Sequence, residues 1–181
     1  MTWTGTGSIS TEADETKRQK MVLSSLFASL MAVCAWICIP IPPVTFTLQT
    51  FGVLLSLGIL GRRWGMVSVL LYLAMGIAGL PVFSGFQGGV SVLLGPTGGF
   101  LWGFLLGSLV YRLTESLGKP VSMVLCQLVC YLCGCLWFCH WAGCGMMTAA
   151  LTCVIPYLVF DGLKLWLAWH LSRRIGKHLK N

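Results

Sequence analysis

The sequence feature that most limits the fold of this chain is a set of apolar runs that are long enough to cross a bilayer. The longest, Val121–Trp169, spans 49 residues, of which only Asp161 and Lys164 carry a full charge. A transmembrane helix needs about 20 mainly apolar residues, so this run has room for two helices and a short turn. Over the whole chain, 56% of residues are hydrophobic and 9% are charged, whereas soluble domains have about 25% charged residues. The sequence therefore predicts an all-α integral membrane protein.

Six apolar segments are predicted to cross the membrane. They are Met21–Ile39, Leu48–Leu60, Gly65–Leu80, Thr97–Leu117, Pro120–Cys139 and Thr152–Ser172. The second and third are short for a crossing helix. The turn between the last two is placed at His140–Gly145. We therefore expect a six-transmembrane-helix bundle that forms a single domain over residues 21–172.

The basic residues indicate how this bundle lies in the membrane. If the chain crosses six times, eleven of its twelve Lys and Arg residues fall on one side, and the twelfth is Lys164. Because basic residues gather on the cytoplasmic side, both termini are expected to be cytoplasmic. Residues 1–20 are then a polar, disordered cytoplasmic tail, and residues 173–181 a basic cytoplasmic tail. The net charge of +7 reflects this topology, and no nucleic-acid binding is expected.

Nearly all of the nine cysteines lie inside apolar runs, five of them in one predicted span. Disulfide frameworks belong to small secreted folds with polar loops, which this sequence does not resemble. A metal site at Cys133–Cys135 or at Cys139 with His140 is the alternative interpretation. We favour small packing residues in membrane helices, and expect neither a metal nor a cofactor.

Asp161 and Lys164 are the strongest candidates for a functional site. A charge at the bilayer centre costs about 2.5–3.5 kcal/mol, so charged residues there are rare and face the protein interior. At a spacing of three residues, the two side chains project from the same face of a helix. The pair predicts a binding site within the membrane, and the alternative is a structural ion pair.

Small residues mark two further candidate surfaces. Ala28 and Ala32 form a stripe on the first span that allows close contact, either within the bundle or with a partner subunit. Gly98 and Gly99 follow Thr97 at the start of the fourth span, where free backbone N–H groups could receive a carboxylate. A turn or packing role for these glycines is the alternative.

Four stretches of the sequence form an ordered set of motifs. They are Val44–Thr50 after a proline-rich loop, Gly79–Gly85 with Gly88 and Gly89, Gly95–Phe100, and Pro156 followed by Asp161 and Lys164. In this order they resemble the motifs of the BioY family, the biotin-specific S components of energy-coupling-factor (ECF) transporters. The resemblance runs from about Ser24 to Arg174.

The resemblance implies a multi-pass protein of the cell membrane that serves biotin uptake. It would be the high-affinity substrate-binding subunit, which captures biotin on the external side, and it would not be an enzyme. ATP hydrolysis would lie on partners, namely a transmembrane coupling subunit and two ATPase subunits. In the family, an Ala-x-x-x-Ala ridge docks on the coupling subunit, and Ala28 and Ala32 match it. The alternatives are an S component for another vitamin, a stand-alone secondary transporter and, more distantly, a small membrane enzyme.

The predicted ligand site centres on Asp161 and Lys164. We expect Lys164 to meet a polar end of biotin, with the carboxylate as first choice. Asp161 would accept a ureido N–H or hold Lys164 charged and oriented. The other predicted ligand-binding residues are Gln49, Tyr72, Phe83, Gly85, Gln87, Gly98, Gly99 and Tyr157.

Overall fold

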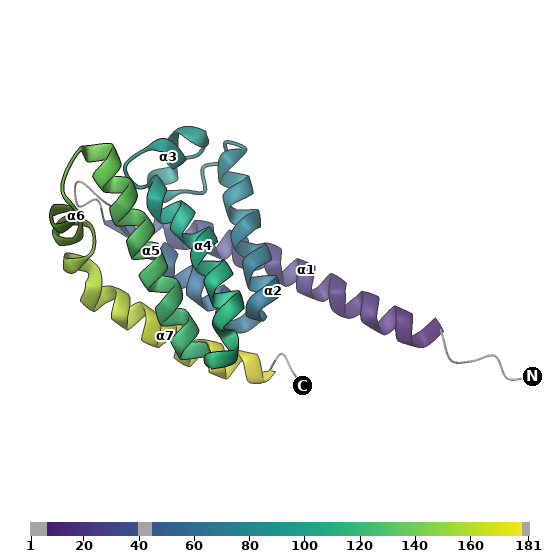
Figure 1. Ribbon diagram of the computed structural model, residues 1–181. Coiled ribbons are helices and arrows are strands. Elements are labelled where there is room, and N and C mark those ends of the chain that lie inside the picture. The colour runs from purple at the N-terminus through teal and green to yellow at the C-terminus, as the bar shows by residue number, and fades with distance from the viewer. Residues whose placement is uncertain (1–6, 40–44, 179–181) are drawn as a thin grey trace, which may run out of the picture.

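The computed structural model describes residues 7–39 and 45–178, and they are mainly helical (Figure 1). The main helices are α1 (Gly7–Trp36), α2 (Gln49–Ile77), α3 (Val90–Leu94), α4 (Gly98–Thr114), α5 (Lys119–Ala142), α6 (Met146–Cys153) and α7 (Leu158–His178). Short 3-10 helices are η1 (Ser84–Phe86), η2 (Glu115–Leu117) and η3 (Ile155–Tyr157). The strands β1 (Cys38–Ile39) and β2 (Phe46–Thr47) pair as an antiparallel hairpin.

Four helical stretches are long and apolar enough to cross a membrane, in agreement with the predicted class of fold. They are Glu15–Trp36, Gln49–Ile77, Lys119–Ala142 and Met146–Gly176. The proline-rich loop at residues 40–44 and the outermost tail residues 1–6 and 179–181 lie outside the described residues.

Helix α2 consists of two arms that meet at Gly61. This residue has φ +75° and ψ −176°, a backbone conformation that favours glycine. A Cβ atom on Gly65 would lie 2.8 Å from the Cα atom of Leu57, although residues eight apart in a straight helix are separated by about 12 Å. The arms 49–60 and 62–77 therefore fold back on each other, as expected from the predicted boundary between Leu60 and Gly65.

Helices α4 and α5 approach each other through small residues. A Cβ on Gly103 would lie 2.8 Å from the Cα of Cys130, and one on Gly107 would lie 2.9 Å from the carbonyl oxygen of Cys126. Both cysteines are buried and make no disulfide. Glycine on one membrane helix and a small side chain on the other allow backbone contact. This packing explains why cysteines recur on this face of α5.

Two segments differ from the sequence prediction. Helix α1 begins at Gly7, so the segment predicted as a disordered tail through residue 20 is helical from residue 7. Most polar residues can be accommodated in a helix at little cost. The helix therefore continues without a break from this segment into the apolar stretch. The last predicted span, Thr152–Ser172, is interrupted at Val154, which has φ −123° and ψ −55°. Pro156 lies two residues further on and cannot donate a helical hydrogen bond, so α7 begins after it and continues to His178.

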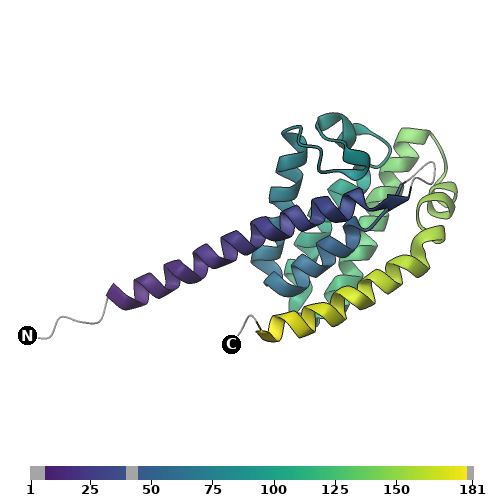
Figure 2. The same ribbon diagram turned by 180° about the vertical axis from the view of Figure 1, so that it is seen from behind.

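Basic residues lie at one end of the bundle, near the bend in α2. The Lys119 ammonium donates a hydrogen bond of 2.8 Å to the carbonyl oxygen of Gly58. The backbone N–H of Arg62 donates to Glu115 Oε2 over 3.2 Å. We call this the basic end. The β hairpin, η1 and α3 lie toward the opposite end, and α1 extends past the other helices (Figure 2).

Candidate ligand-binding pocket

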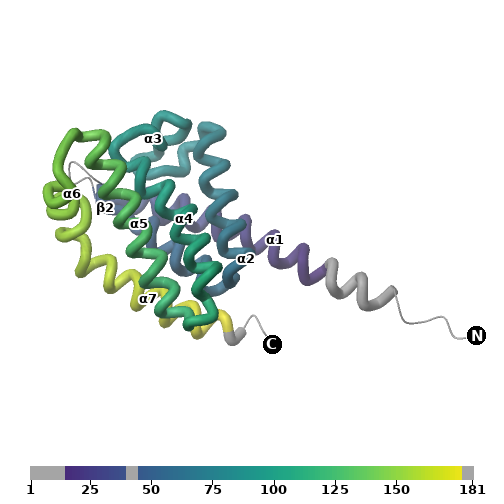
Figure 3. The backbone as a smooth tube through the Cα atoms, viewed as in Figure 1, coloured from purple at the N-terminus to yellow at the C-terminus, as the bar shows by residue number. Residues whose placement is uncertain are grey.

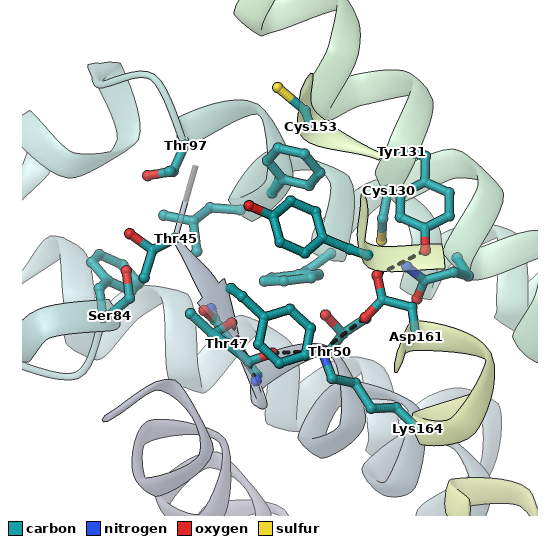
Figure 4. Close-up of a pocket in the computed structure, with 18 of the residues that line it drawn as sticks. Thr45, Thr47, Thr50, Ser84, Thr97, Cys130, Tyr131, Cys153, Asp161 and Lys164 are labelled. Atoms are coloured by element: carbon teal, nitrogen blue, oxygen red, sulfur yellow. Dashed lines mark hydrogen bonds and ion pairs between the residues drawn. The ribbon is translucent and has the colours of Figure 1, made fainter. Parts of the chain in front are cut away.

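A cavity lies between β2, η1 and the first turns of α2, α4 and α7, with α5 as its back wall (Figure 4). The empty space between its walls, including the part open to solvent at the mouth, is about 700 Å³. Its lining residues are Thr45, Phe46, Thr47, Gln49, Thr50, Phe83, Ser84, Val92, Thr97, Phe100, Leu101, Phe104, Gln127, Cys130, Tyr131, Cys153, Tyr157, Asp161 and Lys164.

Asp161 and Lys164 form an ion pair in the wall of this cavity. Lys164 Nζ lies 2.7 Å from Asp161 Oδ1, and the two residues are 6% and 8% exposed. The second carboxylate oxygen, Oδ2, accepts a hydrogen bond of 2.8 Å from the Tyr131 hydroxyl group on α5. Each oxygen of an ionised carboxylate can accept two hydrogen bonds. Asp161 therefore retains acceptor capacity toward the cavity.

Lys164 also connects α7 to the β hairpin. Its ammonium donates a second hydrogen bond, of 2.7 Å, to the carbonyl oxygen of Thr47. The same nitrogen lies 3.8 Å from the centre of the Phe46 ring, a cation–π contact. Phe46 in turn stacks on Tyr157 with ring centres 5.6 Å apart. The charge of Lys164 is thus compensated on three sides. Through Phe46, β2 lies beside η3 and the start of α7 (Figure 3).

A hydrogen-bonded chain positions the opposite wall. Gln49 Nε2 donates to the Tyr72 hydroxyl oxygen over 2.8 Å, and that hydroxyl donates to the carbonyl oxygen of Val82 over 3.0 Å. Phe83 packs edge-to-face on Tyr72, with ring centres 5.6 Å apart. Tyr72 is fully buried behind the wall, so it fixes Gln49 and Phe83 at the cavity surface.

The structure brings five of the ten predicted ligand-binding residues to the cavity. These are Asp161, Lys164, Gln49, Phe83 and Tyr157. Tyr72 lies behind the wall.

Gly85 and Gln87 are exposed in the loop around η1 and do not line the cavity. The Gln87 carbonyl oxygen accepts a hydrogen bond of 2.9 Å from the Phe83 N–H and so closes this loop. Gly98 and Gly99 serve close packing. A Cβ on Gly98 would overlap the Leu93 carbonyl group, and one on Gly99 would lie 2.7 Å from the Cys133 carbonyl oxygen.

The three α5 residues that line the cavity were not predicted from the sequence as ligand contacts. Gln127, Cys130 and Tyr131 line the cavity from one face of α5, at the i, i+3 and i+4 spacing of neighbours on a helix. The signal in the sequence that could have found this wall is the side-chain amide of Gln127 in a mainly apolar predicted span. A second set of lining residues carries hydroxyl groups and was not predicted as ligand-binding: Thr45, Ser84 and Thr97.

The Ala28 and Ala32 stripe faces the interior of the bundle. The two residues are 1% and 5% exposed and belong to the main hydrophobic core. Near them, a Cβ on Gly52 of α2 would lie 3.3 Å from the Cα of Met31. In this structure the stripe packs within the chain, and its docking on a partner stays a prediction.

A helical bundle with several apolar spans and a buried ion pair in a cavity near one end defines a multi-pass protein of the cell membrane with an internal polar pocket. Residues 9–181 match the sequence profile of the BioY family, and the chain belongs to that family. The resemblance found in the sequence motifs is thereby confirmed.

Three curated relatives illustrate the similarity. The biotin transporter BioY of Thermotoga maritima is 48% identical over 85 residues, which are 47% of this chain and 50% of that protein. The probable biotin transporter BioY of Pyrococcus horikoshii is 45% identical over 85 residues, 47% of this chain and 52% of that protein. The biotin transporter BioY2 of Lactococcus lactis is 45% identical over 86 residues, 48% of this chain and 47% of that protein. The matches span about half the length of these relatives.

The fold is also that of a solved structure. A crystal structure of the S-component for biotin from an ECF-type ABC transporter superposes with a TM-score of 0.84. The superposition covers 90% of this chain and 93% of that one, at 24% sequence identity. The similarity assigns the S-component fold to this chain.

Proposed function

We propose that this chain is the substrate-binding S subunit of a biotin uptake system and binds biotin in the cavity around Asp161 and Lys164. The observation that carries the proposal is the buried ion pair in the wall of a cavity with both apolar and polar lining. An isolated pair inside a membrane protein is costly and contributes little stability. A binding role gives a reason for this cost. Family membership and the names of the relatives support biotin as the ligand.

The cavity has the chemical composition that biotin requires. Biotin carries an apolar ring and chain, a ureido group with two N–H donors and one carbonyl, and a carboxylate. Aromatic rings of Phe46, Phe83 and Tyr157 supply apolar walls. Asp161 can accept a ureido N–H at one end of the cavity. The hydroxyl groups of Thr45, Ser84 and Thr97 lie toward the opposite end (Figure 4), where they could donate to a carboxylate.

Lys164 lies at the Asp161 end of the cavity and stays a candidate for a polar group of the ligand there, which is the predicted carboxylate if biotin binds in the opposite orientation. Two of its three ammonium hydrogens are donated to Asp161 and Thr47, so one remains for a ligand. The contact with Phe46 places the charge against the cavity wall.

We propose six membrane crossings, with the two arms of α2 counted separately and α6 to α7 counted as one. The basic end supports cytoplasmic termini, including residues 1–20 and 173–181. Ser24, one turn after Lys20, donates to the Trp64 carbonyl oxygen near the α2 bend over 3.3 Å. A Cβ on Gly58 would lie 2.7 Å from that of Ser172. The positive-inside rule assigns this end to the cytoplasm, which leaves the cavity toward the external side.

Energy coupling is proposed to come from a transmembrane ECF coupling subunit and two ATPase subunits. The sequence carries no GxxxxGK[ST] phosphate-binding loop. The S-component fold supports this division of labour. Docking through Ala28 and Ala32 would require that this side of α1 becomes accessible to the partner, since both residues are buried in the isolated chain.

Ligand-induced thermal stabilisation of the detergent-purified chain tests the proposal. A ligand at 100 times its Kd adds about 2.7 kcal/mol to the free energy of unfolding. We expect this stabilisation with biotin, and none with thiamine or riboflavin at the same concentration. Stabilisation by another vitamin but not by biotin would favour the alternative S-component function. No stabilisation by any of them would contradict the binding role of the cavity.

A further inference from the structure

Gln127 carries a polar atom whose environment the fold does not explain. The residue lies on α5, is 7% exposed and lines the cavity. Its carbonyl oxygen, Oε1, is buried and has no hydrogen-bond partner among the residues that the structure describes. More than nine in ten buried polar groups in proteins have a partner, so an exception in a cavity wall calls for a specific explanation.

The neighbouring donors on α5 are already committed. The Cys130 thiol, one turn along the helix, donates to the Gly103 carbonyl oxygen over 3.2 Å. The Tyr131 hydroxyl donates to Asp161 Oδ2 over 2.8 Å. Neither side chain has a second proton to give to Gln127 Oε1. Since Gln127 lines the cavity, a ligand bound there can supply the donor that this oxygen lacks.

Gln127 and Asp161 together create an end of the cavity that is rich in acceptors. Both residues line the cavity. Tyr131 lies one helical turn from Gln127 on α5 and donates a hydrogen bond to Asp161. Asp161 has lone pairs left after its two contacts. Two acceptors at one end complement a ligand that presents two N–H donors, as a cyclic urea does.

We propose that Gln127 is a specificity-determining residue whose Oε1 accepts a hydrogen bond from a ureido N–H of the bound ligand, beside Asp161. This assignment rests on the proposed function. It distinguishes ligands with a urea or amide N–H at that end from ligands of similar shape without one, because the latter leave the buried oxygen unpaired.

Equilibrium binding of biotin to purified variants tests the assignment. Gln127→Met keeps the length and apolar stem of the side chain and removes the acceptor. We expect it to raise the Kd for biotin about tenfold or more. Gln127→Glu keeps an acceptor oxygen at the same position and should bind biotin better than Gln127→Met. Tyr111→Phe is the matched control, because it removes a hydroxyl group that is also buried without a partner among the described residues but lies outside the cavity.

The thermal stability of the ligand-free variants separates recognition from a structural role. Since Oε1 has no partner in the chain, Gln127→Met should melt at the same temperature as the unsubstituted chain or above it. A Kd within twofold of the unsubstituted value would overturn the assignment. Equal losses of binding in Gln127→Met and Gln127→Glu, with a lower melting temperature in both, would also overturn it. If the unsubstituted chain binds no biotin while Tyr111→Phe and the parent melt normally, the proposed function itself fails.

Discussion

The Lys164 ammonium lies 2.7 Å from the Thr47 carbonyl oxygen, a contact between residues 117 positions apart. It joins the start of α7 to β2, the strand that precedes α2. The same ammonium pairs with Asp161, so one cation holds the ion pair and the hairpin together. A change at Lys164 therefore affects both the charge balance of the cavity and the position of its β-hairpin wall.

Removing the cation should destabilise the chain more than removing the whole pair. Lys164→Met leaves Asp161 buried without its counter-ion, a situation that costs about 3–5 kcal/mol. We expect this variant to lose biotin binding and thermal stability. The double variant Lys164→Met with Asp161→Asn should recover stability but not binding. Thermal unfolding in detergent and a biotin binding isotherm measure the two effects. Equal stability of the single and double variants would contradict the inferred role of the pair.

The hydroxyl group of Tyr131 should contribute to the site through Asp161. Tyr131→Phe removes a buried hydrogen bond to a charged group, which contributes about 1.5–3 kcal/mol. We expect a lower melting temperature and weaker biotin binding. Tyr111→Phe provides the comparison, because its hydroxyl is buried without a partner among the described residues. If both substitutions have the same effect on stability, the hydrogen bond to Asp161 contributes nothing measurable.

The contact between α4 and α5 should be intolerant of any side chain at Gly103. A Cβ there would lie 2.8 Å from the Cα of Cys130, so Gly103→Ala forces the backbones apart. Overpacking of this kind typically costs about 1–3 kcal/mol. Gly162→Ala on α7 is the matched control, because no atom lies within 4 Å of its Cβ position. Since alanine is the better helix former, this control should be neutral or stabilising in the same unfolding experiment.

The burial of Ala28 predicts where the first helix tolerates a large side chain. Ala28→Trp should lower the thermal stability of the isolated chain, because the residue is 1% exposed. Ser29→Trp, at the next position on the exposed face, should leave stability and biotin binding unchanged. Co-purification of both variants with a coupling subunit then tests docking. A fully stable Ala28→Trp chain that no longer co-purifies would instead place this stripe at the partner interface.

The sequence was sufficient to predict the helical class and the burial of the charged pair. Long apolar runs have few structural solutions in a membrane, and the two charges in the last run had to face the interior. The break at Gly61 was also foreseeable, since a basic pair follows a short apolar segment there.

Other features depend on how the helices pack. Tyr131 lies 30 residues from Asp161, and the sequence does not give the register of α5 against α7 that lets them meet. Gly98 and Gly99 looked like a place for an anion, but their missing side chains make room for Leu93 and for α5. Glycine before a helix is compatible with both uses, and only tertiary contacts distinguish them.

The close contact of α4 with α5 has a consequence for how a ligand enters. Along Gly99, Gly103 and Gly107, the glycines of α4 bring its backbone against α5 with almost no side-chain volume between them. Such a seam cannot widen gradually, because any separation opens a void along its length. The back wall of the cavity is therefore a fixed surface. Admission and release of a ligand must be accommodated by the elements that face this wall, which are the β hairpin, the η1 loop and the start of α7.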